Sequence, residues 1–389
     1  MSLGLHRPGV CLILWGHELG FLCQLELEIG GRIVCQTNSS WDYLGGPATS
    51  SELYNGEIFD TTLSDAVWSS ATVGAVTGSS EPFADIRKVN ELPFLKAEVF
   101  ALDVAPAGKI MEIKPERIIT TPSGKKVLDF GHNLVGWLRI ETNTKGSGES
   151  LIKHAEVMEN GQLGTRSLRT AKVQVAVRLG GETKGYGPKF TFFGYRIQVR
   201  SLSIAVADQD KPPTPSLHLA DTFSYAEITE HDSLQLSDFT AIVVSSLLCR
   251  TGSFECSHGL INKLHENAVW LIRGNFVSLP TRCPQRDERL GWTGYLQVFA
   301  PMANVLFDTS AFLGHWLRVL EADQRDIGGV VPNVVPSIPI PPRHPEKRPM
   351  AVWADCAILA SLGFYNTFGD IKHFPAHWEI MRLWLDKGG

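Results

Sequence analysis

The sequence predicts a multidomain protein in which β-rich segments come first and a helical segment follows. Its 389 residues exceed the length of one ordinary domain and indicate two or three. Up to about residue 203, apolar and polar residues alternate as in half-buried strands, whereas beyond about residue 255 the apolar residues recur every three or four positions. This order favours antiparallel sandwiches ahead of a helical barrel or bundle.

The β-rich half consists of short alternating runs that Gly, Pro and Asn separate. Residues 25–29 alternate and are followed by Gly30-Gly31, a hairpin signal, and then by residues 32–35. Similar runs occur at 110–113, 126–130, 138–141, 172–177 and 195–199. Because no long helical stretch separates these runs, antiparallel pairing is favoured over a parallel βαβ sheet.

The second half begins after a polar, Pro-rich stretch at residues 208–215, which is typical of a linker or an exposed loop. Leu260, Leu264, Ala268 and Leu271 then share one helical face. Comparable apolar stripes begin at Leu296, Trp316, Ile358 and Ile380. A Pro-rich loop at residues 332–345 separates the second and third of these, so four or five helices fit before the last residue.

Composition excludes several classes of function. The chain has 36 basic and 41 acidic residues and a net charge of −5, so nothing indicates nucleic acid or an anionic membrane as a partner. Its seven cysteines form no CxxC pair or His/Cys cluster, so we expect no metal site and no cofactor. The apolar run at residues 10–15 is too short to span a bilayer. The compartment, secreted or cytoplasmic, stays open.

A charged cluster, Arg-Asp-Glu-Arg at residues 286–289, interrupts otherwise apolar sequence and is followed by Trp292. Buried charges must be paired, or each costs several kcal/mol. One interpretation is a capped helix start, with Pro284 in the first turn and the charges in solvent. The other is a sugar-hydrolysing site, which needs a protonated carboxyl, an aromatic wall and an arginine that orients hydroxyls.

A longer stretch identifies a family. Residues 274–281 lead into Cys-Pro-Gln-Arg-Asp-Glu-Arg-Leu-Gly-Trp-Thr-Gly at 283–294, and together they resemble the signature of glycoside hydrolase family 78, the α-L-rhamnosidases. Weaker matches extend over most of the chain. They lie at residues 51–57, 129–137, 154–157, 168–169, 191–196, 252–257 and 353–355.

The resemblance implies a fold and its boundaries. Two β-sandwich domains are expected at residues 1–108 and 109–205, a linker at 206–250, and the first portion of an (α/α)6 barrel at 251–389. The inward faces of an incomplete barrel would lack partners, so we expect exposed apolar surface and aggregation or oligomerisation.

The resemblance also implies inverting hydrolysis of terminal non-reducing α-L-rhamnose from rhamnose-containing glycosides. Glu288 matches the family's general acid. The positions expected around the sugar are Arg286, Asp287, Trp292, Trp353 and Asp355. Inversion needs a general base about 6.5–9.5 Å from the acid. The family places that base in the later half of the barrel, beyond the end of this chain.

Two positions depart from the family pattern. Arg282 and Tyr295 stand where the family has aspartates that bind rhamnose hydroxyls, and losing two acceptors could cost several kcal/mol of binding. Arg282 is also expected to bring positive charge towards Glu288, which favours the ionised carboxylate. The alternative is therefore a truncated or non-catalytic rhamnosidase-like protein. A third reading is another helical-barrel sugar enzyme, such as a polysaccharide lyase.

Overall fold

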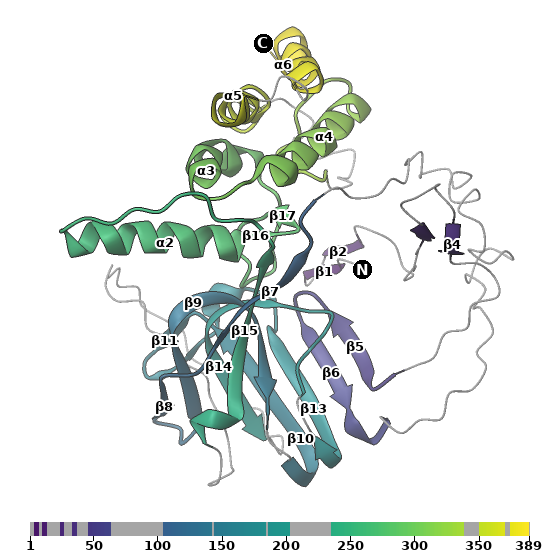
Figure 1. Cartoon of the computed structure of the whole chain (residues 1–389). Helices are drawn as coiled ribbons and strands as arrows, with labels where there is room; N and C mark the ends of the chain where they lie inside the picture. The colour runs from purple at the N-terminus through teal and green to yellow at the C-terminus, as the bar shows by residue number, and fades with distance from the viewer. Residues whose placement is uncertain are drawn as a thin grey trace, which may run out of the picture.

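The computed structural model shows a β-rich part and a helical part that lie against each other (Figure 1). It describes residues 4–7, 10–13, 24–26, 33–36, 46–63, 104–141, 144–183, 186–202, 235–337, 350–369 and 374–388. The expected Gly30-Gly31 turn, the Pro-rich stretch at 208–215 and residues 338–345 of the second Pro-rich loop lie outside these ranges.

A nine-stranded sheet forms the β-rich part. Its order is β5 (Ala48–Glu52), β6 (Gly56–Asp60), β13 (Gln174–Thr183), β10 (Thr144–Ala155), β14 (Phe193–Leu202), β9 (Lys126–Ile140), β15 (Phe239–Ser246) and β7 (Ala107–Ile113), with β8 (Arg117–Thr120) also paired to β9. All neighbours are antiparallel except β6 and β13. The antiparallel prediction is therefore confirmed for most of the sheet.

Among the described residues of the β-rich part, three further strand pairs are separate from this sheet and antiparallel: β1 (Gly4–Arg7) with β2 (Val10–Ile13), β3 (Gln24–Glu26) with β4 (Ile33–Gln36), and β11 (Val157–Glu159) with β12 (Gln162–Gly164). The 3-10 turns in the described ranges are η1 (Thr61–Leu63), η2 (Arg166–Leu168) and η3 (Leu236–Asp238). The β3–β4 hairpin lies where alternation and the Gly-Gly signal predict one.

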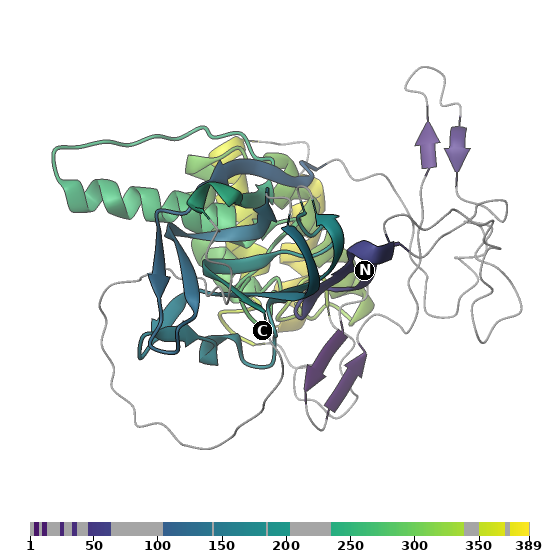
Figure 2. The ribbon, with the colours of Figure 1, turned by 90° about the horizontal axis from the view of Figure 1, so that it is seen from below.

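The sheet encloses a single aromatic core. Tyr54 in the β5–β6 turn, Phe130, Phe193, Tyr195 and Phe239 are all buried in one cluster. Tyr54 and Phe239 come from opposite ends of the strand order, so the sheet must curl to bring them together. Figure 2 shows this curvature from below, with the strands arching over one another.

Two observations differ from the expected domain boundaries. Residues 239–246, inside the expected linker, form β15, whose side chains are all buried between β9 and β7. The linker expectation is wrong there because a continuous apolar run gives no alternation to recognise. In addition, β6 pairs with β13, so the sheet crosses the boundary expected at residue 108.

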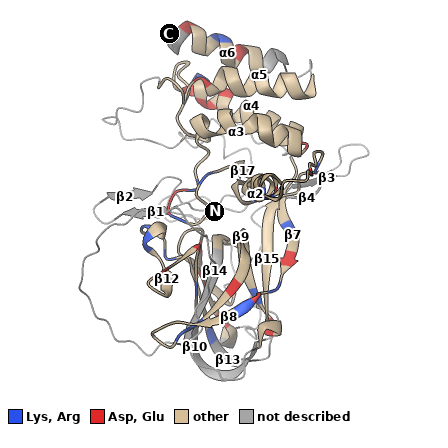
Figure 3. Ribbon diagram, turned by 90° about the vertical axis from the view of Figure 1, so that its left-hand side faces the viewer, with Lys and Arg blue, Asp and Glu red and all other residues tan. Residues whose placement is uncertain are grey.

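The described residues of the second part form five helices. They are α2 (Gly259–Asn275), α3 (Thr293–Leu306), α4 (Ser310–Asp326), α5 (Cys356–Phe368) and α6 (Phe374–Gly388). A short hairpin connects α2 to the segment before α3. Its two strands, β16 (Phe276–Val277) and β17 (Leu279–Pro280), have two residues each. Helices α3 to α6 pack around Phe312, Trp316 and Phe364, and α2 packs on β9 and β15. Figure 3 shows α3 to α6 above the sheet, with basic and acidic residues interspersed along the ribbon.

Several helix faces lack a partner among the described residues. On α2, Leu260 and Leu264 are 76% and 68% exposed, while Val269 and Ile272 face the core. The predicted α2 stripe is therefore a solvent-exposed face rather than the buried one. Val298 and Val305 on α3 are similarly exposed. These faces match the exposed apolar surface expected of an incomplete barrel. Within the described ranges, no helix has the length and apolarity that a membrane span requires.

Candidate functional site

The charged cluster lies in the segment between β17 and α3. Residues 284–287 form turns, and the helix begins only at Thr293. The interpretation of residues 286–289 as a helix start is therefore wrong. Cys283 and Arg289 have φ values of 57° and 56°, a left-handed conformation that non-glycine residues rarely adopt. These two turns fold the segment into a compact loop, residues 282–292, which we call the charged loop.

The charged loop is docked on the β-rich part. The backbone N–H of Gly194 donates to the Pro284 carbonyl at 3.1 Å. A Cβ atom on Gly194 would lie 2.7 Å from the backbone nitrogen of Gln285, so only glycine allows this approach. The Tyr54 hydroxyl donates to the Glu288 carbonyl at 2.8 Å. Burial raises the pKa of Tyr54 to about 12, so this hydroxyl stays a donor at neutral pH.

Arg289 is the main anchor of the charged loop. Its side chain is buried, and Nη1 donates to the carbonyls of Leu53 at 2.6 Å and Phe192 at 2.8 Å. Its guanidinium also lies 5.3 Å from the Tyr54 ring centroid and 5.1 Å from that of Phe192. Burial lowers the pKa of Arg289 to about 10, so the group is still charged at neutral pH.

Glu288 stands at the centre of the site, with its side chain 13% exposed. Its Oε1 accepts a hydrogen bond from Trp292 Nε1 at 2.9 Å. Its Oε2 pairs with Arg286 Nη2 at 2.9 Å and with Arg169 Nη1 at 3.3 Å. The structure therefore brings together three of the predicted site residues, Glu288, Arg286 and Trp292, around one carboxylate.

Asp287 points into the protein. Its Oδ2 accepts hydrogen bonds from the Thr170 backbone at 3.3 Å and from the Thr170 hydroxyl, and Oδ1 lies 3.8 Å from Arg169 Nη1. The side chain is buried. These contacts tie the charged loop to the segment that follows η2, and a direct sugar contact by Asp287 stays a prediction.

Arg169 is the site residue that sequence reasoning missed as a functional group. It follows η2 with φ 59° and ψ −114°, a strained conformation for an arginine. That conformation places its guanidinium between Asp287 and Glu288. The family match at Leu168-Arg169 is the only sequence pattern that singles out Arg169. Its spacing does not indicate that Arg169 approaches a loop more than 100 residues further along the chain.

Trp353 and Asp355 precede α5. A Cβ atom on Gly294 would lie 2.8 Å from the Trp353 ring, so the ring packs directly on the first turn of α3. The Trp353 and Tyr295 rings meet edge to face, with centroids 6.0 Å apart. Asp355 Oδ2 accepts from the backbone N–H of Val352 at 2.9 Å and closes the turn before α5. Trp353 thus borders the site, while the Asp355 carboxylate is engaged in its own turn.

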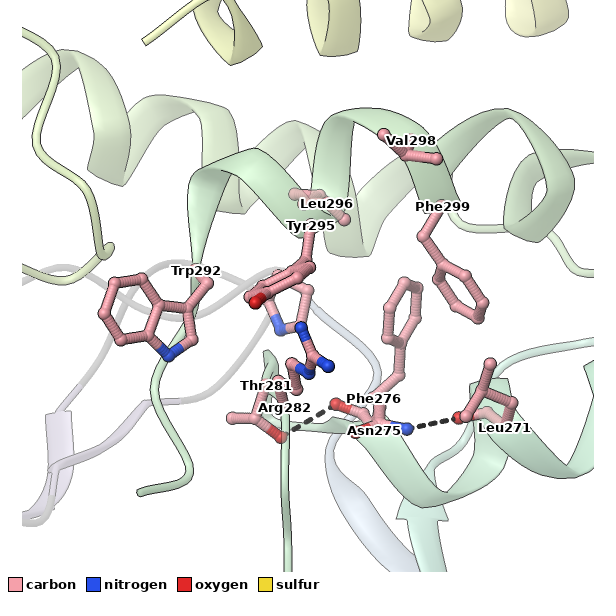
Figure 4. A pocket seen from close by; sticks show the side chains of 11 residues that line it. Leu271, Asn275, Phe276, Thr281, Arg282, Trp292, Tyr295, Leu296, Val298 and Phe299 are labelled. Carbon is pink, nitrogen blue, oxygen red and sulfur yellow. Dashed lines mark hydrogen bonds between the residues drawn. The ribbon is translucent and has the colours of Figure 1, made fainter. Parts of the chain in front are cut away.

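Arg282 and Tyr295 contact each other. The guanidinium carbon of Arg282 lies 3.6 Å from the Tyr295 ring centroid. Among the described residues, Arg286 and Arg169 are the arginines that pair with Glu288, and the expectation that Arg282 brings positive charge towards this carboxylate stays a prediction. Arg282 and Tyr295 line a cavity of about 420 Å³ together with Trp292 (Figure 4).

A second cavity of about 460 Å³ lies between β9, α2 and the charged loop. Glu156 lines it and accepts a hydrogen bond from Asn133 at 3.1 Å. Burial raises the pKa of Glu156. His132 and Trp270 stack in its wall, with ring centroids 5.3 Å apart. Among the described residues, no group of His, Cys, Asp and Glu is arranged to hold a metal ion.

Three family models match consecutive parts of the chain. They describe the α-L-rhamnosidase N-terminal domain over residues 9–107, the bacterial α-L-rhamnosidase concanavalin-like domain over 119–212, and the bacterial α-L-rhamnosidase six-hairpin glycosidase domain over 249–389. An α-L-rhamnosidase of Streptomyces avermitilis is 30% identical over 377 residues, which are 95% of this chain and 32% of the relative. One from Formosa agariphila is 29% identical over 375 residues, with 94% and 36% covered. The chain spans about a third of the length of these curated relatives.

Solved structures agree with this assignment. The native α-L-rhamnosidase from Aspergillus terreus superposes with a TM-score of 0.73 at 35% identity, over 92% of this chain and 38% of that one. The Streptomyces avermitilis α-L-rhamnosidase complexed with L-rhamnose gives 0.72 at 28% identity, over 94% and 32%. With a shared fold and three family domains in succession, the chain is an α-L-rhamnosidase-like protein of glycoside hydrolase family 78, covering the N-terminal domains and the first part of the catalytic domain.

Proposed function

We propose that this chain carries the proton-donor side of a site that hydrolyses terminal α-L-rhamnosides with inversion, and that Glu288 is the general acid. The observation that carries the proposal is the set of contacts that the Glu288 carboxylate makes. Arg286, Arg169 and the Trp292 indole hold its two oxygens within a loop that Arg289 anchors. A fixed carboxyl beside an aromatic wall is what a leaving glycosidic oxygen requires.

In this mechanism each residue has a separate task. Glu288 transfers a proton to the glycosidic oxygen as the bond to the anomeric carbon breaks. Trp292 holds the orientation of Glu288 through the 2.9 Å hydrogen bond and presents its ring to the sugar. Arg286 binds substrate hydroxyls next to the carboxyl, and Trp353 adds a second aromatic surface. Inversion also needs a base that activates water on the opposite face. Asp287 is not assigned that role, because its carboxylate is buried against Thr170.

The test is release of p-nitrophenol from p-nitrophenyl α-L-rhamnoside by the full chain. Glu288→Gln keeps the size of the side chain but removes the proton, so we expect at least a hundredfold loss of turnover from general-acid catalysis. Glu321→Gln is the matched control, because Glu321 pairs with Arg325 on α4, away from the site. Equal rates for the Glu288→Gln variant and the wild-type chain would show that the acid is misassigned.

The second candidate is a non-catalytic rhamnosidase-like protein. The observation in its favour is the Arg282–Tyr295 stack, which occupies the two positions where acceptors for rhamnose hydroxyls are expected. On this reading the chain neither hydrolyses rhamnosides nor binds free rhamnose. Calorimetric titration with L-rhamnose separates the two candidates, because a measurable affinity excludes complete loss of the sugar site.

A further inference from the structure

The cavity beside Trp292 has apolar walls and a single cationic group. It lies between the end of α2 and the first turns of α3 (Figure 4). Leu271, Phe276, Leu296 and Phe299 contribute apolar surface to it. Its volume of about 420 Å³ falls within the range of small-molecule sites, roughly 300–1,000 Å³. Among the described residues that line it, Arg282 is the only charged one.

The Arg282 guanidinium stacks on an aromatic ring and pairs with no acidic side chain that the structure describes. Its central carbon lies 3.6 Å from the Tyr295 ring centroid, and the residue is solvent-exposed, so a ligand can reach its N–H groups. The other arginines of the charged loop are engaged, since Arg286 pairs with Glu288 and Arg289 with two carbonyls. Within the described part of the chain, no carboxylate forms an ion pair with Arg282. A fixed, unpaired guanidinium at an apolar cavity is a preorganised anion site.

We propose that this cavity binds an aromatic carboxylate, with the ring between the apolar walls and the carboxylate on the fork of Arg282. A guanidinium binds a carboxylate through two parallel N–H bonds, which a neutral ligand cannot accept equally well. The apolar lining favours a flat hydrocarbon ring over a hydroxylated sugar ring. Asn275 also lines the cavity, and its side-chain oxygen is buried without a hydrogen-bond donor among the described residues.

The cavity is next to the proposed proton donor. Trp292 lines it, and the Trp292 indole nitrogen donates to Glu288. An aromatic acid bound here therefore lies against the tryptophan that orients the proposed proton donor. That placement rests on the proposed function, whereas binding of the free acid does not. A binding assay without turnover keeps the two proposals distinguishable.

The experiment is calorimetric titration of the full chain with 4-hydroxybenzoate, with 4-hydroxybenzamide as the neutral match and D-glucuronate as the sugar acid. We expect the benzoate to bind at least about tenfold more tightly than the amide, which corresponds to about 1.4 kcal/mol. Its affinity should fall as salt is added, because the contact is ionic and accessible to solvent. The glucuronate should bind more weakly than the benzoate.

Variants assign the effect to Arg282. Arg282→Gln should abolish the preference for the acid over the amide. Tyr295→Ala should weaken benzoate binding and Tyr295→Phe should restore it, since the phenylalanine ring keeps the stack. Arg273→Gln is the matched control, because Arg273 lies over the Trp270 ring at 5.2 Å and is not in the lining of this cavity. Equal affinities for acid and amide, an unchanged Arg282→Gln variant, glucuronate binding as tight as the benzoate, or no benzoate binding would each overturn the proposal.

Discussion

Replacement of Arg289 by methionine tests whether one buried guanidinium holds the charged loop on the β-rich part. Arg289 donates at 2.6 and 2.8 Å to the carbonyls of Leu53, in the β5–β6 turn, and Phe192, just before β14. A hydrogen bond from a charged donor contributes about 1.5–3 kcal/mol, and two carbonyls are left without this donor in the variant. Methionine recovers part of the apolar packing. It also removes the buried Nε and Nη2, which have no partner among the described residues. The expected net loss is therefore about 2–4 kcal/mol.

Urea denaturation followed by tryptophan fluorescence measures this loss, because Trp292 lies in the loop that Arg289 anchors. Arg289→Lys should fall between the wild type and the methionine variant, since an ammonium cannot reproduce the fork. The control is Arg273→Met, which removes an arginine stacked on a tryptophan but no interface hydrogen bond that the structure records. An Arg289→Met midpoint that is indistinguishable from that of the control would refute the anchoring role.

The remaining predictions concern pH, packing and association. His154 is fully buried, and desolvation lowers its pKa from 6.5 to about 3. The unfolded chain therefore takes up a proton below pH 6.5 that the folded chain excludes, and about 5 kcal/mol of stability should be lost between pH 6.5 and 3; His154→Gln should flatten this dependence in denaturation curves. Gly194→Ala should lower the thermal midpoint by several degrees, because its Cβ would meet the Gln285 backbone at 2.7 Å. Leu260→Ser with Leu264→Ser should reduce self-association in light scattering without lowering the midpoint, because both side chains are solvent-exposed.

The sequence was sufficient for the order of the fold and the centre of the site. Alternation and helical spacing predicted the β-to-α order, and the family resemblance selected Glu288, Arg286 and Trp292, which the structure joins by direct contacts. These successes depend on local patterns. An amphipathic run or a contiguous motif carries its own signal along the chain.

What could not be predicted depends on contacts between distant segments. The strand β15 was missed because Ala-Ile-Val-Val is apolar throughout and has no period. The role of Arg169 could not be predicted because its contact with Glu288 depends on a positive φ at Arg169. The neighbouring sequence does not indicate that backbone conformation. The apolar stripe predicted on α2 forms one helix face, but Leu260 and Leu264 on that face are exposed to solvent. Helical spacing identifies which residues share a face and does not indicate what packs against it.

Proton NMR of p-nitrophenyl α-L-rhamnoside hydrolysis is the most direct test of the central claim, with the wild-type chain and the Glu288→Gln variant run side by side. The account predicts that the first sugar released by the wild-type chain is the β anomer, which then mutarotates, and that the variant releases at least a hundredfold less in the same time. Initial release of the α anomer, release at equal rates by both proteins, or no release by the wild-type chain would contradict it.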